Sequence, residues 1–97
     1  MKDKDIFEVI LSESVKKELK KVPQHINVKL LGWVDDVSNR GIREVRKIPG
    51  YHDEPLKGKR LGQRSIRLSK AYRAVYILDD LNNIAIIKVT EVNKHEY

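Results

Sequence analysis

The stretch PLKGKRLGQRSIRLSKAYRAVYIL, residues 55–78, decides both the fold and the electrostatic character of this 97-residue chain. It holds seven basic residues and no acidic residue, whereas the whole chain has 20 Lys and Arg and 14 Asp and Glu. The rest of the chain is left with 13 basic and 14 acidic residues, so the net charge of +6 lies in this one segment. A solvated basic surface is the simpler interpretation, but charge gathered on one small element favours an anionic partner, with nucleic acid as the first candidate.

The same stretch predicts a β-hairpin. Residues 64–68 and 72–78 are two strand-like runs, the second rich in β-branched and aromatic residues, and residues 69–71 form a three-residue loop between them. A third strand-like run, residues 84–92, follows a polar turn and completes an antiparallel meander.

The part of the chain before the hairpin predicts one strand and two helices. Residues 6–11 are apolar and β-prone, and Ser12 can cap the helix that follows. From Pro23 onward, apolar residues recur at helical spacing until Gly41, and Trp33 lies on that apolar stripe as a core residue. The predicted order is β-α-α-β-β-β, an α+β fold with two N-terminal helices packed on a small, mostly antiparallel sheet.

Composition sets the class of protein. We expect one domain spanning residues 1–97, because the chain is too short for two cores. It contains no cysteine, which excludes disulfides and thiolate metal sites, and its three histidines lie far apart, so neither a metal nor a cofactor is expected. The beginning of the chain does not have the features of a signal peptide, and no apolar run is long enough to span a membrane; we therefore expect a cytoplasmic protein.

The hairpin predicts a charged cluster. With a three-residue loop, Arg67 lies directly opposite Arg73, and two like charges in that position are destabilising unless an anion or a neighbouring carboxylate accompanies them. If Leu78 pairs with Ile84, Glu91 has the parity to reach the same face, and the continued alternation points His95 and Tyr97 to that side.

Such a cluster contains the groups that RNA cleavage needs. Guanidinium groups can hold a scissile phosphate and its developing charge, a histidine can transfer a proton near neutral pH, and a tyrosine can transfer a proton or stack on a base. The 2′-hydroxyl of RNA would attack the adjacent phosphate. The alternative to a functional role for His95 and Tyr97 is that they belong to a frayed chain end.

The run RSIRLSKAYRAVY, preceded by PLKGKRLGQ and followed by a strand and a tail that ends in tyrosine, resembles the RelE/HigB/ParE toxins of bacterial type II toxin–antitoxin systems. The resemblance covers nearly the whole chain and is most specific at Arg67 and the Tyr72–Arg73 pair. The stretch from Gly50 to Ser65 and the NKHEY ending look closest to the HigB-like members.

The resemblance implies a ribosome-dependent endoribonuclease that cleaves mRNA in the ribosomal A site and is inactive while a cognate antitoxin, of a helix-turn-helix, HigA-like type, is bound. It implies catalytic roles for Arg67, Arg73, His95 and Tyr97. It also implies RNA-binding roles for Lys57, Lys59, Arg60, Arg64 and Lys94. Two alternatives stay open: a ParE-like, non-catalytic inhibitor of DNA gyrase, and a non-toxic module that binds RNA or the ribosome.

Overall fold

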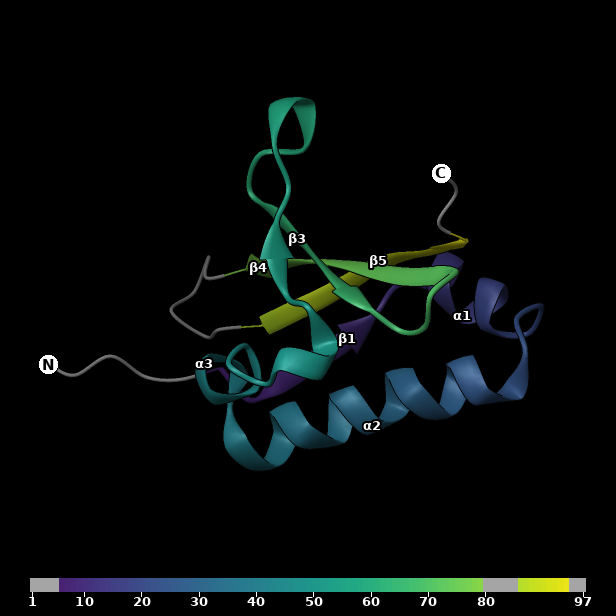
Figure 1. Ribbon diagram of the computed structural model, residues 1–97, viewed down its shortest axis with the longest axis horizontal. Helices are drawn as coiled ribbons and strands as arrows, with labels where there is room; N and C mark the ends of the chain where they lie inside the picture. The colour runs from purple at the N-terminus through teal and green to yellow at the C-terminus, as the bar shows by residue number, and fades with distance from the viewer. Residues whose placement is uncertain (1–5, 80–85, 95–97) are drawn as a thin grey trace, which may run out of the picture.

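The described residues form one five-stranded sheet with the helices on one face (Figure 1). The structure, a computed structural model, describes the backbone of residues 6–79 and 86–94 and the side chains of residues 6–78. The strands lie in the order β1-β5-β4-β3-β2, with β1 parallel to β5 and every other pair antiparallel. Their bounds are β1 Glu8–Leu11, β2 Glu54–Pro55, β3 Gln63–Arg67, β4 Tyr72–Asp79 and β5 Ile86–Lys94.

Within the described residues, three helices and two short 3-10 turns connect the strands. The helices are α1 Glu13–Leu19, α2 Gln24–Arg40 and α3 Ile42–Val45, and the 3-10 turns are η1 Pro49–Tyr51 and η2 Gly58–Arg60. The predicted cap of the first helix is confirmed, since the Ser12 hydroxyl accepts a hydrogen bond from the Val15 amide at 3.2 Å. The long helix ends at Gly41, whose φ of 86° is a conformation that favours glycine.

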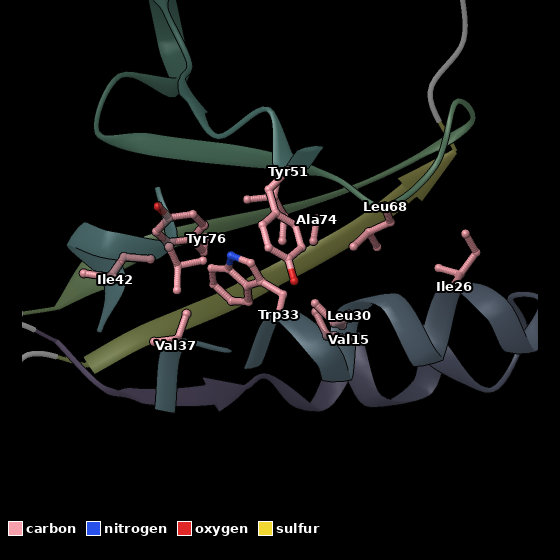
Figure 2. Close-up of a cluster of buried hydrophobic side chains, with 12 residues drawn as sticks. Val15, Ile26, Leu30, Trp33, Val37, Ile42, Tyr51, Leu68, Ala74 and Tyr76 are labelled. Atoms are coloured by element: carbon pink, nitrogen blue, oxygen red, sulfur yellow. The ribbon is translucent and has the colours of Figure 1, made fainter. Parts of the chain in front are cut away.

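The core lies between α2 and the strands β3 and β4. Ile26, Leu30, Trp33 and Val37 recur on one stripe of α2 and are buried. Figure 2 shows the Trp33 ring beside that of Tyr76 on β4, with ring centroids 5.2 Å apart and planes at 46°, a favourable aromatic arrangement. The predicted core position of Trp33 is confirmed.

The predicted element order is confirmed, with additions that the sequence did not suggest. Residues 42–55 contain the short helix α3, the turn η1 and the two-residue strand β2, which extends the sheet beyond β3. No described helix is long and apolar enough to cross a membrane.

The assumed pairing of Leu78 with Ile84 is wrong. Leu78 pairs with Ile87, and a bulge between Val75 and Tyr76 shifts the ladder by one residue along its length. Between the hairpin tip and the bulge, odd-numbered residues of β4 pair with odd-numbered residues of β5, as in the assumed register. Glu91 therefore pairs with Val75, two residues along β4 from Arg73.

Candidate functional site

The tip of the β3–β4 hairpin sets two arginines side by side. Arg67 pairs with Arg73, as predicted, and the loop is closed by a hydrogen bond from the Leu68 amide to the Tyr72 carbonyl at 2.9 Å. Directly opposite residues of an antiparallel pair share one face of the sheet, so both guanidinium groups rise from the face that carries no described helix. We call this surface the open face.

The open face also carries the partners of Arg73. Its Nη1 donates to the Ser65 hydroxyl at 2.7 Å, and its Nη2 lies 3.5 Å from Oε2 of Glu54. The Arg73 side chain is 21% exposed and that of Glu54 57% exposed, so the guanidinium is held from the protein side while the carboxylate stays open to solvent. The Arg67 side chain has no hydrogen-bond or ion-pair partner within the part of the chain that the structure describes.

Glu54 is a site residue that the sequence did not reveal. The facing arginines predicted a carboxylate from a neighbouring strand, and Glu91 on β5 was considered for that part. The described carboxylate beside Arg73 comes from β2, on the other side of the hairpin, where Glu54 pairs with Ser65, and the side chain of Glu91 lies outside the described residues. The signal available in the sequence is the acidic pair Asp53–Glu54 placed immediately before the basic stretch.

A basic loop stands beyond the start of β3. Lys57, Lys59 and Arg60 are exposed on and next to η2, at the end of a segment that projects from the sheet on the side away from α2 (Figure 1). Gly58 and Gly62, with φ of 66° and 96°, supply the left-handed conformations that let the loop turn. The Arg60 Nε donates to Oε1 of Gln63 at 3.0 Å, which ties the loop to the first residue of β3.

Arg60, through its hydrogen bond to Gln63, and Arg67 mark the two ends of one line along β3. Gln63, Ser65 and Arg67 alternate onto the same face, since Ser65 contacts Arg73 and Arg67 pairs with it. At the rise of an extended strand, Gln63 and Arg67 are roughly 13 Å apart. The open face therefore offers a short row of guanidinium groups, suited to an extended polyanion.

Arg64 does not lie with them. It pairs across the hairpin with Tyr76, on the face that covers the core, and its Nε donates to Oδ1 of Asp53 at 2.6 Å. Burial of the guanidinium opposes its charge, but the hydrogen bond and the charge of Asp53 raise the pKa of Arg64 above its ordinary value. The sequence had assigned Arg64 to RNA contact, whereas this geometry gives it an internal partner.

A buried polar network surrounds that ion pair. The Tyr76 hydroxyl donates to Oδ2 of Asp53 at 2.6 Å and accepts from Nε of Arg46 at 3.3 Å. Burial, followed by the hydrogen bond to Asp53, raises the pKa of Tyr76 well above that of a free tyrosine, so its hydroxyl stays protonated. This tyrosine is a core residue and not part of the open face.

Three predicted site residues cannot be placed by their side chains. His95 and Tyr97 lie outside the described residues. Lys94 is the last residue of β5, where its backbone pairs with Tyr72 beside the hairpin tip. Among the described residues, no group of three histidine or acidic side chains is arranged to hold a metal ion.

Comparison with known proteins identifies the fold. No protein-family profile matches the sequence, and no curated protein matches it either. Solved structures do match. YafQ from Escherichia coli superposes with a TM-score of 0.70 at 17% identity, covering 91% of this chain and 92% of that one.

One toxin–antitoxin complex and one RelE–RelB complex give similar matches. The RelBE2 complex of Mycobacterium tuberculosis has a TM-score of 0.67 at 19% identity, covering 93% of this chain and 99% of the matched one. The archaeal RelE–RelB complex of Pyrococcus horikoshii has a TM-score of 0.67 at 20% identity, with 91% and 93% covered. The chain therefore has the RelE-like α+β fold, as its sequence predicted.

Proposed function

We propose that this protein is the toxin of a type II toxin–antitoxin system and acts as an endoribonuclease on mRNA. The observation that carries the proposal is the open-face cluster of Arg67, Arg73, Ser65 and Glu54. Its support from known proteins is the shared fold, since the matching chains include toxins solved with their antitoxins. We further propose that cleavage depends on the ribosome and takes place in its A site, that the protein belongs to the HigB-like subgroup, and that it is cytoplasmic.

The cluster suits cleavage by the RNA's own 2′-hydroxyl. In that reaction a bond forms between the 2′-oxygen and phosphorus while the bond from phosphorus to the 5′-oxygen breaks, leaving a 2′,3′-cyclic phosphate and a 5′-hydroxyl end. Arg67 and Arg73 would hold the phosphate and the charge that builds on its non-bridging oxygens. The two guanidinium groups come from directly opposite positions, so they can reach one phosphate together.

Proton transfer needs a base and an acid near that phosphate. Glu54 is the described carboxylate beside Arg73, and when ionised it can accept the proton of the 2′-hydroxyl. His95 and Tyr97 remain the candidates for the acid that protonates the leaving 5′-oxygen. Lys57, Lys59 and Arg60 on the basic loop, and Lys94 at the end of β5, would contact phosphates of mRNA or ribosomal RNA without reading sequence.

A cognate antitoxin is the expected protein partner. Complexes with RelB, DinJ and YefM have been solved for toxins of this fold. We propose an antitoxin of the helix-turn-helix, HigA-like type, encoded beside this protein, that blocks the open face or neutralises the basic loop.

The test is a map of new mRNA 5′ ends by primer extension, with this protein added to an in vitro translation reaction and, in parallel, to naked mRNA. Cuts confined to translated mRNA, absent with Arg73→Ala and present with Lys70→Ala, support a ribosome-dependent nuclease. Lys70 is the matched control because it is an exposed cation of the same hairpin, in its loop. Cuts on naked mRNA would refute ribosome dependence. No cuts in either reaction would refute the nuclease, and inhibition of DNA gyrase would then be measured.

A further inference from the structure

Two adjacent acidic residues, Asp53 and Glu54, contact the hairpin on opposite faces. Asp53 reaches the core face, where it accepts hydrogen bonds from Arg64 and from Tyr76, each at 2.6 Å. Glu54, the next residue, lies on the open face against Arg73. Successive side chains of an extended strand point to opposite faces, so whatever fixes Asp53 also fixes the direction of Glu54.

The backbone of this segment has few attachments of its own. β2 has only two residues, paired as Glu54 with Ser65 and Pro55 with Arg64, and one further hydrogen bond joins the Leu56 amide to the Gln63 carbonyl at 2.9 Å. Proline has no amide hydrogen to add to the ladder.

The residue before Asp53 adds strain. His52 has φ of 47° and ψ of 50°, a left-handed conformation that is uncommon for a non-glycine residue and needs support from its surroundings. The Asp53 side chain supplies such support, since both of its oxygens are bonded to groups on the two strands of the hairpin.

The Asp53 side chain is fully shielded from solvent, while its partner Arg64 is 26% exposed. The Asp53 carboxylate faces Arg64 directly and Arg46 through the hydroxyl of Tyr76. A buried carboxylate of this kind adds little stability compared with apolar packing, but removing it leaves the guanidinium groups without a counter-charge. The buried Asp53 carboxylate can instead serve to fix one arrangement of the chain, and with it the position of the neighbouring Glu54.

We propose that Asp53 is the positioning residue of the site: its contacts with Arg64 and Tyr76 on the core face hold Glu54 against Arg73 on the open face. Asp53 touches neither Arg73 nor the phosphate, and acts through the backbone it shares with Glu54. The proposal deepens the function proposed above and rests on it for its catalytic consequence, whereas the geometry can be measured without any RNA cleavage.

The experiment follows the Arg73 guanidinium by NMR in ¹⁵N-labelled protein, with the resonance assigned through Arg73→Lys. Rotation about the Cζ–Nε bond is slow when both terminal nitrogens have partners, as Ser65 and Glu54 provide here. Glu54→Gln should speed this rotation about two- to fivefold, the size expected from a partly exposed ion pair. Asp53→Asn should speed it by a similar factor if Asp53 holds Glu54 in place.

The matched control is Asp36→Asn. Asp36 on α2 also accepts a hydrogen bond from a tyrosine, Tyr51, at 2.7 Å, and this tyrosine lies on η1, two residues before Asp53. Asp36→Asn therefore weakens a different attachment of the same segment and leaves the Asp53 contacts in place. The same chemical change there should leave Arg73 rotation unaltered. An increase in both variants would mean that the effect is a general loosening, and would overturn the proposal.

A second variant covers the case in which Asp53→Asn does not fold. Tyr76→Phe keeps the ring beside Trp33 and removes only the hydroxyl that donates to Asp53, so Arg73 rotation should rise, but less than in Glu54→Gln. Unchanged rotation in a folded Asp53→Asn protein, or in Tyr76→Phe if the former is unfolded, would overturn the positioning role.

Cleavage kinetics separate this proposal from the proposed function. Asp53→Asn should lower kcat, as Glu54→Gln does. It should also lower KM, by no more than the two- to fivefold gain in affinity expected for Glu54→Gln, because Arg73 loses its competing carboxylate while the cations that bind RNA are kept. If the wild-type protein cleaves no RNA, the proposed function fails while the NMR result still decides the positioning role.

Discussion

Replacing Glu54 with glutamine should change RNA binding and RNA cleavage in opposite directions. The carboxylate is 3.5 Å from the Arg73 guanidinium, so it competes with any phosphate that approaches the same cation. Coulomb's law at that distance gives about 1.2 kcal/mol in the dielectric of water and about 4.7 kcal/mol at an effective dielectric constant of 20. Since Glu54 is 57% exposed, the value for water applies. Measured exposed ion pairs of this kind contribute ~0.5–1 kcal/mol, which we take as the free energy of the contact between Glu54 and Arg73.

That free energy corresponds to about a two- to fivefold gain in affinity for RNA when the charge is removed. Loss of a general base should at the same time lower the cleavage rate by about 10²- to 10⁴-fold. Binding is measured by fluorescence anisotropy with a single-stranded RNA whose 2′-hydroxyls are methylated, which cannot be cleaved by this chemistry. Cleavage is measured by primer extension in a translation reaction.

The control is Glu44→Gln, because Glu44 forms an exposed ion pair with Lys47 at 3.2 Å on α3 and its loss changes the net charge equally. An equal gain in affinity for both variants would show that overall charge, and not the contact with Arg73, is responsible. Weaker binding of the Glu54→Gln protein, or undiminished cleavage by it, would refute the reasoning.

Three further predictions concern stability and binding. Leu30→Ala should lower the free energy of unfolding by about 2–5 kcal/mol, because Leu30 is fully buried, whereas Leu31→Ala on the exposed side of the same helix should change it by less than about 0.5 kcal/mol; urea denaturation measures both. Burial next to a carboxylate raises the pKa of Tyr76, so its contribution to stability is complete below pH ~10, the pKa of an unfolded tyrosine, and falls as the pH rises toward the folded value. Tyr76→Phe should flatten that alkaline decline in thermal melts, and an unchanged slope would contradict the assignment. Replacing Lys57 and Lys59 together with alanine should reduce the slope of log affinity against log salt by about 1.4 for single-stranded RNA, and an unchanged slope would exclude phosphate contacts by the basic loop.

The sequence predicted the parts of the fold that depend on local periodicity. Ile26, Leu30, Trp33 and Val37 are spaced so that only a helix can bury them together, and the structure buries all four. The hairpin register followed from the length of a short loop, which fixes the pairing of Arg67 with Arg73 without reference to the rest of the chain. Both predictions used interactions between residues close in sequence.

The register of β5 could not be predicted in the same way. A bulge between Val75 and Tyr76 displaces the pairing, and nothing in the local sequence marks its position. The same limit hid β2, whose two residues are too few to show any alternation and which forms only because β3 offers an open edge.

Arg64 shows how charge and strand periodicity can give different answers for one residue. The family resemblance placed it with the RNA-binding cations, but it lies on the same face of the strand as Ile66 and Leu68, two residues whose apolar character predicts the core face. The periodicity was the better guide, because the pleat of a strand allows no exception within a regular ladder, whereas a charge can be neutralised wherever a partner is available. Asp53 is that partner. Because successive side chains of an extended chain point to opposite faces, the Asp53 carboxylate lies on the core face, where it neutralises Arg64, and the Glu54 carboxylate lies on the open face against Arg73. A segregated basic stretch is therefore divided between two faces with different tasks, and the site is built by the cations of the open face together with a carboxylate that lies just outside the stretch.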